Sequence, residues 1–154
     1  MGSARPCVGA AGRRLGGRGT MGAGAAGVGD GGDGLTVVGV PARPRDANMG
    51  GTIFGGWIMS HVDIAGSIPA LERARGAVVT RAVDSFEFKK PVYIGDLVSC
   101  YAEIVTTGKT AIRVRVEVFA DRMHKGDIEC VKVTEATLVY VAIDEHGKPR
   151  PLPE

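Results

Sequence analysis

One long apolar segment near the middle of the chain constrains the fold most strongly. From residue 48 to residue 63 the chain reads N-M-G-G-T-I-F-G-G-W-I-M-S-H-V-D, and apolar residues continue as far as Ile68. A helix of this composition has almost no polar face, so it is expected to be buried nearly all round. The rest of the chain must therefore supply a layer of structure that covers it.

The predicted helix has recognisable ends. It begins at Gly55–Gly56 and runs for about five turns. Pro69 lies inside it and predicts a kink or a weakened last part, because proline cannot donate a main-chain hydrogen bond. The run E-R-A-R-G at 72–76 places basic residues in the final turn and a glycine just beyond it, which is typical of a helix end.

The remaining patterned segments resemble strands. Aliphatic residues alternate with Arg113, Arg115 and Glu117, which is the two-residue period of a half-buried strand whose arginines form a solvated face. Strands are predicted at 35–40, 78–88, 97–106, 110–120 and 128–143. Long antiparallel strands cannot cover their own apolar face, so we expect an α+β fold with a curled antiparallel β-sheet wrapped around one long central helix.

Composition divides the chain into three parts. Thirteen of the 24 glycines lie in residues 1–34, among Ala and Arg and almost no large apolar residues. Such a segment cannot bury enough surface to offset its ordering entropy, so we predict a disordered tail there. The folded domain is predicted at 35–145, followed by a polar, proline-rich tail at 146–154.

Charge and apolar content exclude two classes of partner. Residues 35–154 carry 15 basic and 15 acidic side chains, and a neutral body argues against nucleic-acid binding. No apolar run approaches the ~20 residues that span a bilayer, so no membrane insertion is expected. Cys7, Cys100 and Cys130 lack metal-ligand spacing. Cys100 and Cys130 are predicted to be buried thiols, which suits a reducing compartment, and we predict a cytoplasmic location.

Asp63 is the main candidate for chemistry. An ionised carboxylate in an apolar helix loses solvation worth several kcal/mol unless something pairs with it. One interpretation is a core acid that is bonded to main-chain amides or to a lysine. The other is a catalytic carboxylate, which is favoured because Gly66, one turn later on the same face, leaves space beside it.

Gly55 and Gly56 are candidates for an oxyanion hole. The first amides of a helix lack partners within the helix, and the helix dipole increases their attraction for negative charge. A glycine at this point lets a substrate oxygen approach, and one such donor stabilises a transition state by about 2.7–4 kcal/mol. Close packing of the incoming loop against the helix is the alternative explanation, and it is compatible with the first.

The spacing of these candidates predicts an oligomer. Gly55 and Asp63 are eight residues apart, which at ~1.5 Å per residue separates them by about 12 Å along one helix. They cannot both touch the same carbonyl group. If both act on one substrate, the donor and the acid come from different subunits, and a two-fold dimer has two sites at its interface.

Other polar residues have less specific signals. Asn48 either forms a turn or orients a water molecule or a carbonyl group. His61 points about 200° around the helix from Asp63 and is interpreted as a core or interface residue. Four basic residues in predicted loops are candidates for holding a phosphorylated ligand: Lys89, Lys90, Lys148 and Arg150.

Three ordered motifs give a resemblance to a known family. They are D-A-N-M-G-G-T-I-F-G-G-W-I-M-S-H-V-D-I-A-G at 46–66, F-K-K-P-V-Y-I-G-D at 88–96 and G-K-P-R-P-L-P at 147–153. With these motifs the chain resembles the YciA-like branch of the acyl-CoA thioesterases over about residues 35–153. The resemblance implies the hotdog fold and the hydrolysis of acyl-CoA to a free acid and CoA. It also implies a dimer, often assembled as a trimer of dimers.

The resemblance assigns roles to the matching positions. Asp63 would be the general base for water or the nucleophile, and Gly55, with Gly56, would hold the thioester oxygen. Asn48 would help to position the carbonyl group or the water. Phe54 stands where related thioesterases often have a histidine, and it is expected to contact substrate. No metal or cofactor is implied, since CoA is part of the substrate and the product.

Two rival functions are compatible with the same fold. One is a non-catalytic hotdog module that binds acyl-CoA. The other is a hotdog hydratase or dehydratase, whose chemistry would need an acid and a histidine in one site. His61 faces away from Asp63 in the predicted helix and does not supply that pair.

Overall fold

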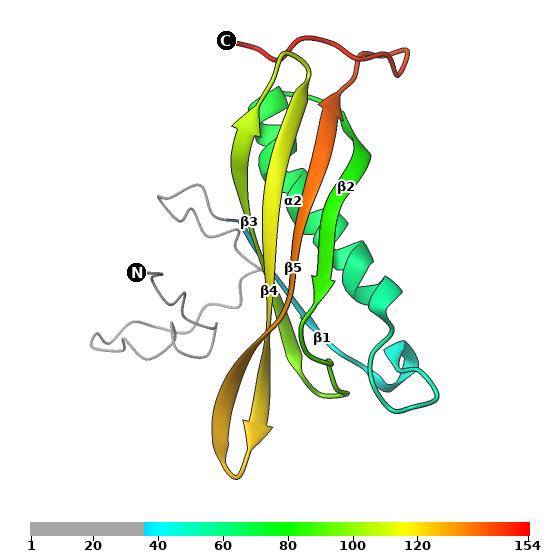
Figure 1. Cartoon of the computed structure of the whole chain (residues 1–154), viewed down its shortest axis with the longest axis vertical. Coiled ribbons are helices and arrows are strands. Elements are labelled where there is room, and N and C mark those ends of the chain that lie inside the picture. Colours follow the sequence, from blue (N-terminus) through cyan, green and yellow to red (C-terminus); the bar gives the residue numbers. More distant parts are fainter. Residues whose placement is uncertain (1–35) are drawn as a thin grey trace, which may run out of the picture.

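The computed structural model describes residues 36–154, which form one antiparallel sheet and one long helix (Figure 1). The helix α2 spans Gly55–Ala74, and a short 3-10 helix, η1, spans Pro44–Asp46. The strands are β1 (Thr36–Pro41), β2 (Val78–Phe88), β3 (Leu97–Thr107), β4 (Ala111–His124) and β5 (Asp127–Ala142). The predicted α+β class is confirmed. The predicted tail at 1–34, with Cys7, lies outside the described residues.

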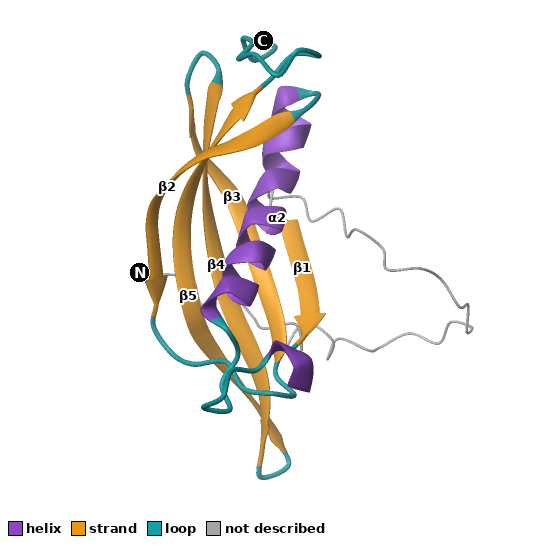
Figure 2. Ribbon diagram, turned by 90° about the vertical axis from the view of Figure 1, so that its right-hand side faces the viewer, coloured by secondary structure: helices purple, strands orange, loops and turns teal. Residues whose placement is uncertain are grey.

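The strands lie in the order β1-β3-β4-β5-β2, and every neighbouring pair is antiparallel. The sheet curves along α2, which runs over its inner face (Figure 2). Alternate residues of the three central strands face this helix and are buried, as the two-residue period predicts. The largest of them are Tyr140, Ile112, Leu138, Val98, Val114, Val116 and Val118.

The helix is not buried nearly all round in the single chain, so that prediction is wrong. One face of α2 is buried against the sheet, through Ile58, Val62, Ala65 and neighbouring residues. On other faces Ile64 is 54% exposed and Met59 is 44% exposed. The reason is geometric, because five strands cover one side of the helix and leave the apolar residues of the other side open.

The helix continues through Pro69 to Ala74 without interruption. Arg75, rather than the following glycine, has the left-handed conformation that ends it (φ 49°). Gly76 instead leaves room for a side chain. A Cβ atom there would stand 2.6 Å from Arg150 Nη2, and this guanidinium donates a hydrogen bond to the carbonyl of Ala74 (2.8 Å). Arg150 therefore caps the end of α2.

The last residues of the chain lie against the body of the domain. The amide of Arg150 donates to the carbonyl of Ala142 (2.9 Å), and Arg73 Nη1 donates to the carbonyl of Pro153 (2.7 Å). Leu152 packs against the core. The proline-rich segment at 146–154 thus contributes to the stability of the helix end.

The hairpin of β4 and β5 is longer than the sequence predicts. Pairing continues to His124 and Asp127, beyond the predicted strand end at residue 120, and Lys125 and Gly126 make the turn. This extension carries Cys130, which is exposed, so the prediction of a buried thiol there is wrong. Cys100 is buried as predicted, and burial raises the pKa of its thiol to about 12. Among residues 36–154, no helix has the length and apolar character to cross a membrane.

Candidate active site

Asp63 lies on α2 where the helix faces β2 and β5. Thr80 Oγ1 donates a hydrogen bond to Asp63 Oδ1 (2.5 Å). The hydroxyl of Tyr140 lies 2.7 Å from the main-chain oxygen of Asp63 and 3.2 Å from its Oδ1. The carboxylate is half-buried rather than enclosed, because Thr80 belongs to an edge strand of the sheet. Asp63 is therefore a bonded acid that solvent can still reach.

Strand register brings the two hydroxyl groups together. Thr80 and Tyr140 are directly opposite each other in the pairing of β2 with β5. Opposite residues of an antiparallel pair place their side chains side by side on one face, and here both reach Asp63. The register shifts between Thr80 and Ala82, so a β-bulge lies next to the site.

The space that Gly66 leaves beside Asp63 is filled. A Cβ atom at Gly66 would stand 2.4 Å from the hydroxyl oxygen of Tyr140. Tyr140 is fully buried, and burial, with the nearby charge and hydrogen bonding of Asp63, raises the pKa of its hydroxyl. Sequence reasoning missed Thr80 and Tyr140, which lie 17 and 77 residues from Asp63. The available signal was a polar residue at a strand position that faces the helix.

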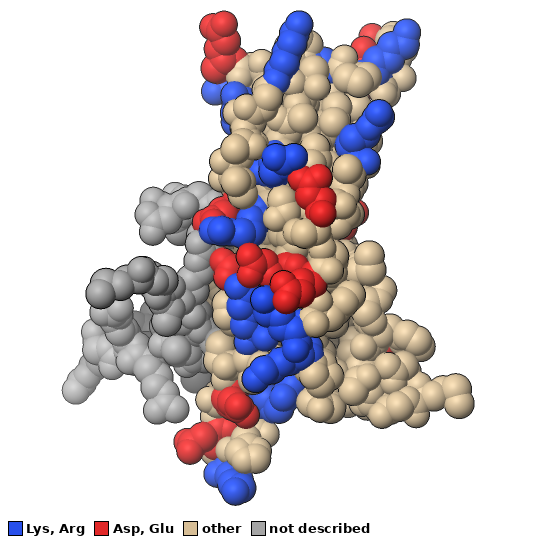
Figure 3. All heavy atoms as spheres, in the orientation of Figure 1, with Lys and Arg blue, Asp and Glu red and all other residues tan. Residues whose placement is uncertain are grey.

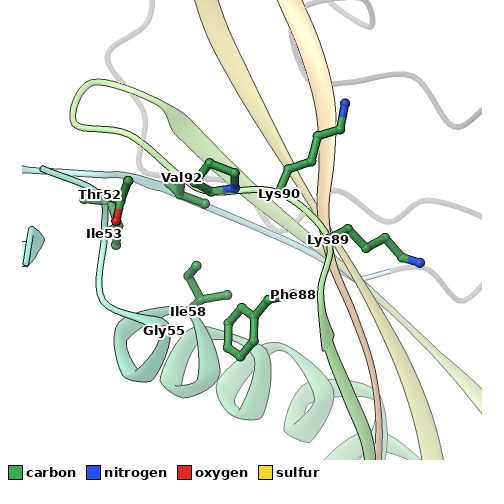
Figure 4. A pocket seen from close by; sticks show the side chains of 9 residues that line it. Thr52, Ile53, Gly55, Ile58, Phe88, Lys89, Lys90 and Val92 are labelled. Atoms are coloured by element: carbon green, nitrogen blue, oxygen red, sulfur yellow. The ribbon is translucent and has the colours of Figure 1, made fainter. Parts of the chain in front are cut away.

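A separate cavity of about 330 Å³ opens at the first turn of α2 (Figure 4). Phe88 lies over Gly55, since its Cζ atom is 3.1 Å from where a Cβ on Gly55 would stand. The remaining walls are largely apolar, and the lining residues are Thr52, Ile53, Gly55, Ile58, Phe88, Lys89, Lys90, Pro91 and Val92. An apolar cavity beside unpartnered helix amides suits an apolar group that carries a carbonyl.

The two predicted basic residues of this loop contribute little charge to the cavity. The amides of Lys89 and Lys90 both donate to the carbonyl of Val133 (2.8 and 3.3 Å). Their amino groups extend away from Gly55 and Phe88 (Figure 4). Lys89 Nζ lies 3.2 Å from a carboxylate oxygen of Glu87. Both residues thus line the cavity while their amino groups extend away from it.

A buried ion pair anchors the loop that forms the cavity wall. Arg122 Nε and Nη2 donate to the two carboxylate oxygens of Asp96 (3.0 and 2.7 Å), and Nη2 also donates to the carbonyl of Pro91 (3.2 Å). The guanidinium lies over the ring of Tyr93, 4.5 Å from its centre. The amide of Ile53 donates to the carbonyl of Val92 (2.8 Å), which ties this loop to the entrance of α2.

The side chain of Asn48 is engaged in its own turn. Its Oδ1 accepts hydrogen bonds from the amides of Gly50 (2.8 Å) and Thr52 (3.3 Å), and its Nδ2 donates to Thr52 Oγ1 (2.9 Å). In the single chain Asn48 therefore forms the turn that leads into the helix. The catalytic role stays a prediction.

The remaining predicted residues lie on the helix or immediately before it. Phe54 precedes α2, is 54% exposed and does not line the cavity. A Cβ on Gly56 would meet open space. His61 packs edge-on against Trp57, with the ring centres 4.3 Å apart, and burial lowers its pKa. No hydrogen bond joins His61 to Asp63 among the described residues.

Lys148 and Arg150 lie near the opposite end of α2 from the cavity. Arg150 caps Ala74, and the amide of Lys148 donates to Asp144 Oδ1 (2.9 Å). Within one chain these two residues are not brought together with Gly55 or with Asp63. The described residues contain no group of three or more His, Cys, Asp or Glu that could hold a metal ion.

The outer face of the sheet carries charged side chains that form ion pairs. Basic and acidic side chains alternate over it (Figure 3). Arg113 Nε lies 2.8 Å from Asp84 Oδ2, and Arg115 pairs with Glu103. Both arginines are partly exposed, which confirms the predicted solvated face.

Comparison with known proteins identifies relatives along most of the chain. Residues 50–126 match the model of a family described as the thioesterase superfamily. The acyl-CoA thioester hydrolase YciA of Salmonella typhimurium is 49% identical over 113 residues, which are 73% of this chain and 85% of that protein. The match therefore spans most of both proteins.

Solved structures agree with this relationship. A hexameric hotdog-fold thioesterase of Campylobacter jejuni is 44% identical with a TM-score of 0.73, over 75% of this chain and 88% of that one. An acyl-CoA hydrolase from Staphylococcus aureus, solved with butyryl coenzyme A and coenzyme A, is 29% identical with a TM-score of 0.71, over 79% and 73% of the two chains.

The Staphylococcus aureus hydrolase was also solved as two variants, with alanine in place of an asparagine or of an aspartate. Those two positions are as far apart in its sequence as Asn48 and Asp63 are here. The sequence motifs, the fold and the sequence identity to these relatives all indicate the same family. The chain belongs to the YciA-like acyl-CoA thioesterases of the hotdog-fold thioesterase superfamily.

Proposed function

We propose that this protein hydrolyses acyl-CoA thioesters to a carboxylic acid and CoA. The observation that carries the proposal is the state of Asp63, which Thr80 and Tyr140 contact through Oδ1. Among the described residues no hydrogen bond engages Oδ2. A carboxylate that is held through one oxygen and reachable through the other can act as a general base or as a nucleophile.

The cavity at the start of α2 is the proposed place of the reacting carbonyl and its acyl group. The amide of Gly55, with that of Gly56, would hold the thioester oxygen, because these amides begin the helix and carry its positive end. The apolar walls at Ile58 and Phe88 suit the acyl group. Asn48 would release part of its turn bonding to help position the carbonyl or the water.

The complete site is proposed to lie between two subunits. Gly55 and Asp63 are about 12 Å apart along one helix, so each would act with its counterpart from the partner chain. The exposed apolar side of α2 and the open edge of β2 support a dimer interface. A hexamer built as a trimer of dimers is supported by the hexameric relative of Campylobacter jejuni.

The proposed reaction needs only the chain, water and substrate. Water attacks the carbonyl carbon while Asp63 takes its proton, and the negative charge on the oxygen is stabilised at Gly55. Collapse of the tetrahedral intermediate breaks the carbon–sulfur bond and expels the thiolate, which receives the proton. In the second route Asp63 itself attacks the carbonyl carbon, and the carbon–sulfur bond breaks to release the CoA thiolate and leave an anhydride. Water then hydrolyses the anhydride to the carboxylic acid and restores Asp63, and the proton released goes to the thiolate.

Contacts to the rest of CoA are assigned to other residues of the same motifs. Lys89 and Lys90, at the cavity rim, would pair with CoA phosphates, and Phe54 would contact the bound thioester. Lys148 and Arg150 would serve a site of another subunit, because they lie near the far end of their own helix. No metal or cofactor takes part in this proposal, and a cytoplasmic location remains part of it.

The test is thiol release from a panel of acyl-CoAs of increasing chain length. The expected result is saturable thiol release by the purified protein, and its loss in Asp63→Ala and Asp63→Asn. Full turnover by either variant would contradict the role of Asp63. Saturable acyl-CoA binding without thiol release would instead identify a binding module, and addition or removal of water across a double bond would identify a hydratase.

A further inference from the structure

We infer that Tyr140 is a positioning residue for Asp63, and that it helps to leave Oδ2 as the carboxylate oxygen available to substrate. The inference rests on the proposed function, because that function makes Asp63 the acting group. It adds a residue from β5, far away in the sequence, to the site.

Tyr140 contacts both parts of Asp63. Its hydroxyl lies 2.7 Å from the main-chain oxygen and 3.2 Å from Oδ1 of that residue. The hydroxyl has one hydrogen, which these two acceptors share, so one buried group holds the helix against β5 and also contacts one oxygen of the carboxylate. Thr80 approaches Oδ1 from the neighbouring strand at 2.5 Å, so rotation of the carboxylate would break contacts to two strands.

Gly66 makes this approach possible. A Cβ at this position would stand 2.4 Å from the Tyr140 hydroxyl oxygen and 3.2 Å from two atoms of its ring. The helix could then come this close to the tyrosine only by displacing it. Gly66 therefore leaves the space that the Tyr140 hydroxyl occupies beside Asp63.

The chemistry of the phenol fits a fixed donor. Tyr140 is fully buried, and its pKa is raised by burial, by the charge of Asp63 and by their hydrogen bond. The hydroxyl stays protonated where the carboxylate is ionised, and so it offers one hydrogen without becoming a base. It has no route to substrate except through Asp63, so its effect should fall on turnover and not on substrate binding.

The first test is Tyr140→Phe, which removes only the hydroxyl. Loss of a hydrogen bond to a charged group predicts a fall in kcat of about tenfold or more, with KM changed by less than about twofold. The matched control is Tyr101→Phe, the same deletion on a buried tyrosine of β3 whose ring packs against Phe119. It is expected to keep both constants. A wild-type kcat in Tyr140→Phe would overturn the inference.

The second test is a double-mutant cycle with Gly66→Ala. In the wild-type background the added methyl group displaces the hydroxyl, so we expect a loss of kcat similar to that of Tyr140→Phe. In the Tyr140→Phe background the 2.4 Å contact is absent and only the 3.2 Å contacts to the ring remain, so Gly66→Ala should lower kcat by clearly less than in the wild-type background. Equal losses in both backgrounds would overturn the inference. If Tyr140→Phe does not fold, Gly66→Ala alone must show the same separation of kcat from KM.

Different results would contradict the proposed function and the role of Tyr140. A wild-type protein that releases no thiol contradicts the proposed function. An active wild-type protein whose Tyr140→Phe variant is equally active contradicts only the role of Tyr140.

Discussion

The ring of Phe88 covers Gly55 and leaves its neighbour Gly56 uncovered. A Cβ at Gly55 would stand 3.1 Å from Phe88 Cζ and 3.4 Å from Cε1, whereas a Cβ at Gly56 would have no atom within 4 Å. The two glycines are neighbours in the sequence, yet they have different surroundings. Only the first lies at the wall of the cavity.

We expect Gly55→Ala to lower kcat/KM by about tenfold or more, because the methyl group crowds the amide that is proposed to hold the thioester oxygen. Phe88 is 50% exposed and can move aside, so the fold should survive. Gly56→Ala is expected to cause a smaller loss. Steady-state kinetics on both variants, with melting temperatures beside them, would measure this difference. Equal losses would mean that the contact with Phe88 has no bearing on the site.

Variants that are impaired at Asp63 and at Gly55 are expected to complement each other. In a mixed dimer of Asp63→Ala and Gly55→Ala chains, one of the two shared sites combines the intact Asp63 of one subunit with the intact Gly55 of the other. Random pairing in equal amounts then restores about a quarter of the wild-type sites. Co-expression with two affinity tags and a thiol-release assay would measure the recovery. A site that lies within one chain would give no activity beyond the sum of the separate variants.

Arg122 should matter for stability as well as for substrate affinity. Arg122→Leu leaves the carboxylate of Asp96, which is 2% exposed, buried without its partner, and this predicts a loss of about 3 kcal/mol in the free energy of unfolding. The wall loop at Pro91 also loses its anchor, so KM should rise. Urea unfolding and steady-state kinetics would measure the two effects.

Arg113→Leu is the matched control for this experiment. It breaks an ion pair with Asp84 in which the side chains are 48% and 39% exposed, and pairs in contact with solvent contribute less than about 1 kcal/mol. A similar loss of stability in both variants would show that burial of the Asp96 pair is not what makes it important.

The stability of the protein should depend on His61 in mildly acidic solution. Burial lowers the pKa of His61 in the folded protein, although the charge of Asp46 opposes the shift. The unfolded chain therefore takes up this proton first, and the stability that neutral His61 contributes is present above its unfolded pKa of about 6.5 and is lost as the pH falls. Between about pH 7.5 and pH 5.5 the melting temperature should fall further for the wild type than for His61→Gln. Parallel curves would contradict this assignment.

Local sequence patterns predicted the helix and strands of this fold, but not which residues of different elements contact one another. The start of α2 at Gly55 and the bounds of β2 follow from glycine placement and residue type, and both were predicted correctly. The convergence of Thr80 and Tyr140 on Asp63 depends on strand register and a β-bulge, and no local pattern contains that information. The open apolar side of α2 could not be predicted either, because helical periodicity does not reveal which chain covers each face.

The candidate catalytic residues are easier to find in the sequence than the residues that contact them. Asp63 is conspicuous as an acid surrounded by the apolar residues of a helix, and Gly55 as a glycine at a helix start. From the sequence, Tyr140 is expected to be an ordinary buried residue of a strand. Its hydroxyl acquires a role only through the 2.7 Å contact that Gly66 allows.

The open edge of β2 exposes the newly synthesised chain to aggregation. This strand ends the sheet, and Val79 and Val83 on it are 44% and 47% exposed. An unpaired edge with apolar side chains can pair with the wrong strand as readily as with the right one, so aggregation competes with assembly as long as no other strand covers this edge. Substitutions that weaken this edge should therefore reduce the yield of protein from cells before any effect on catalysis could be measured.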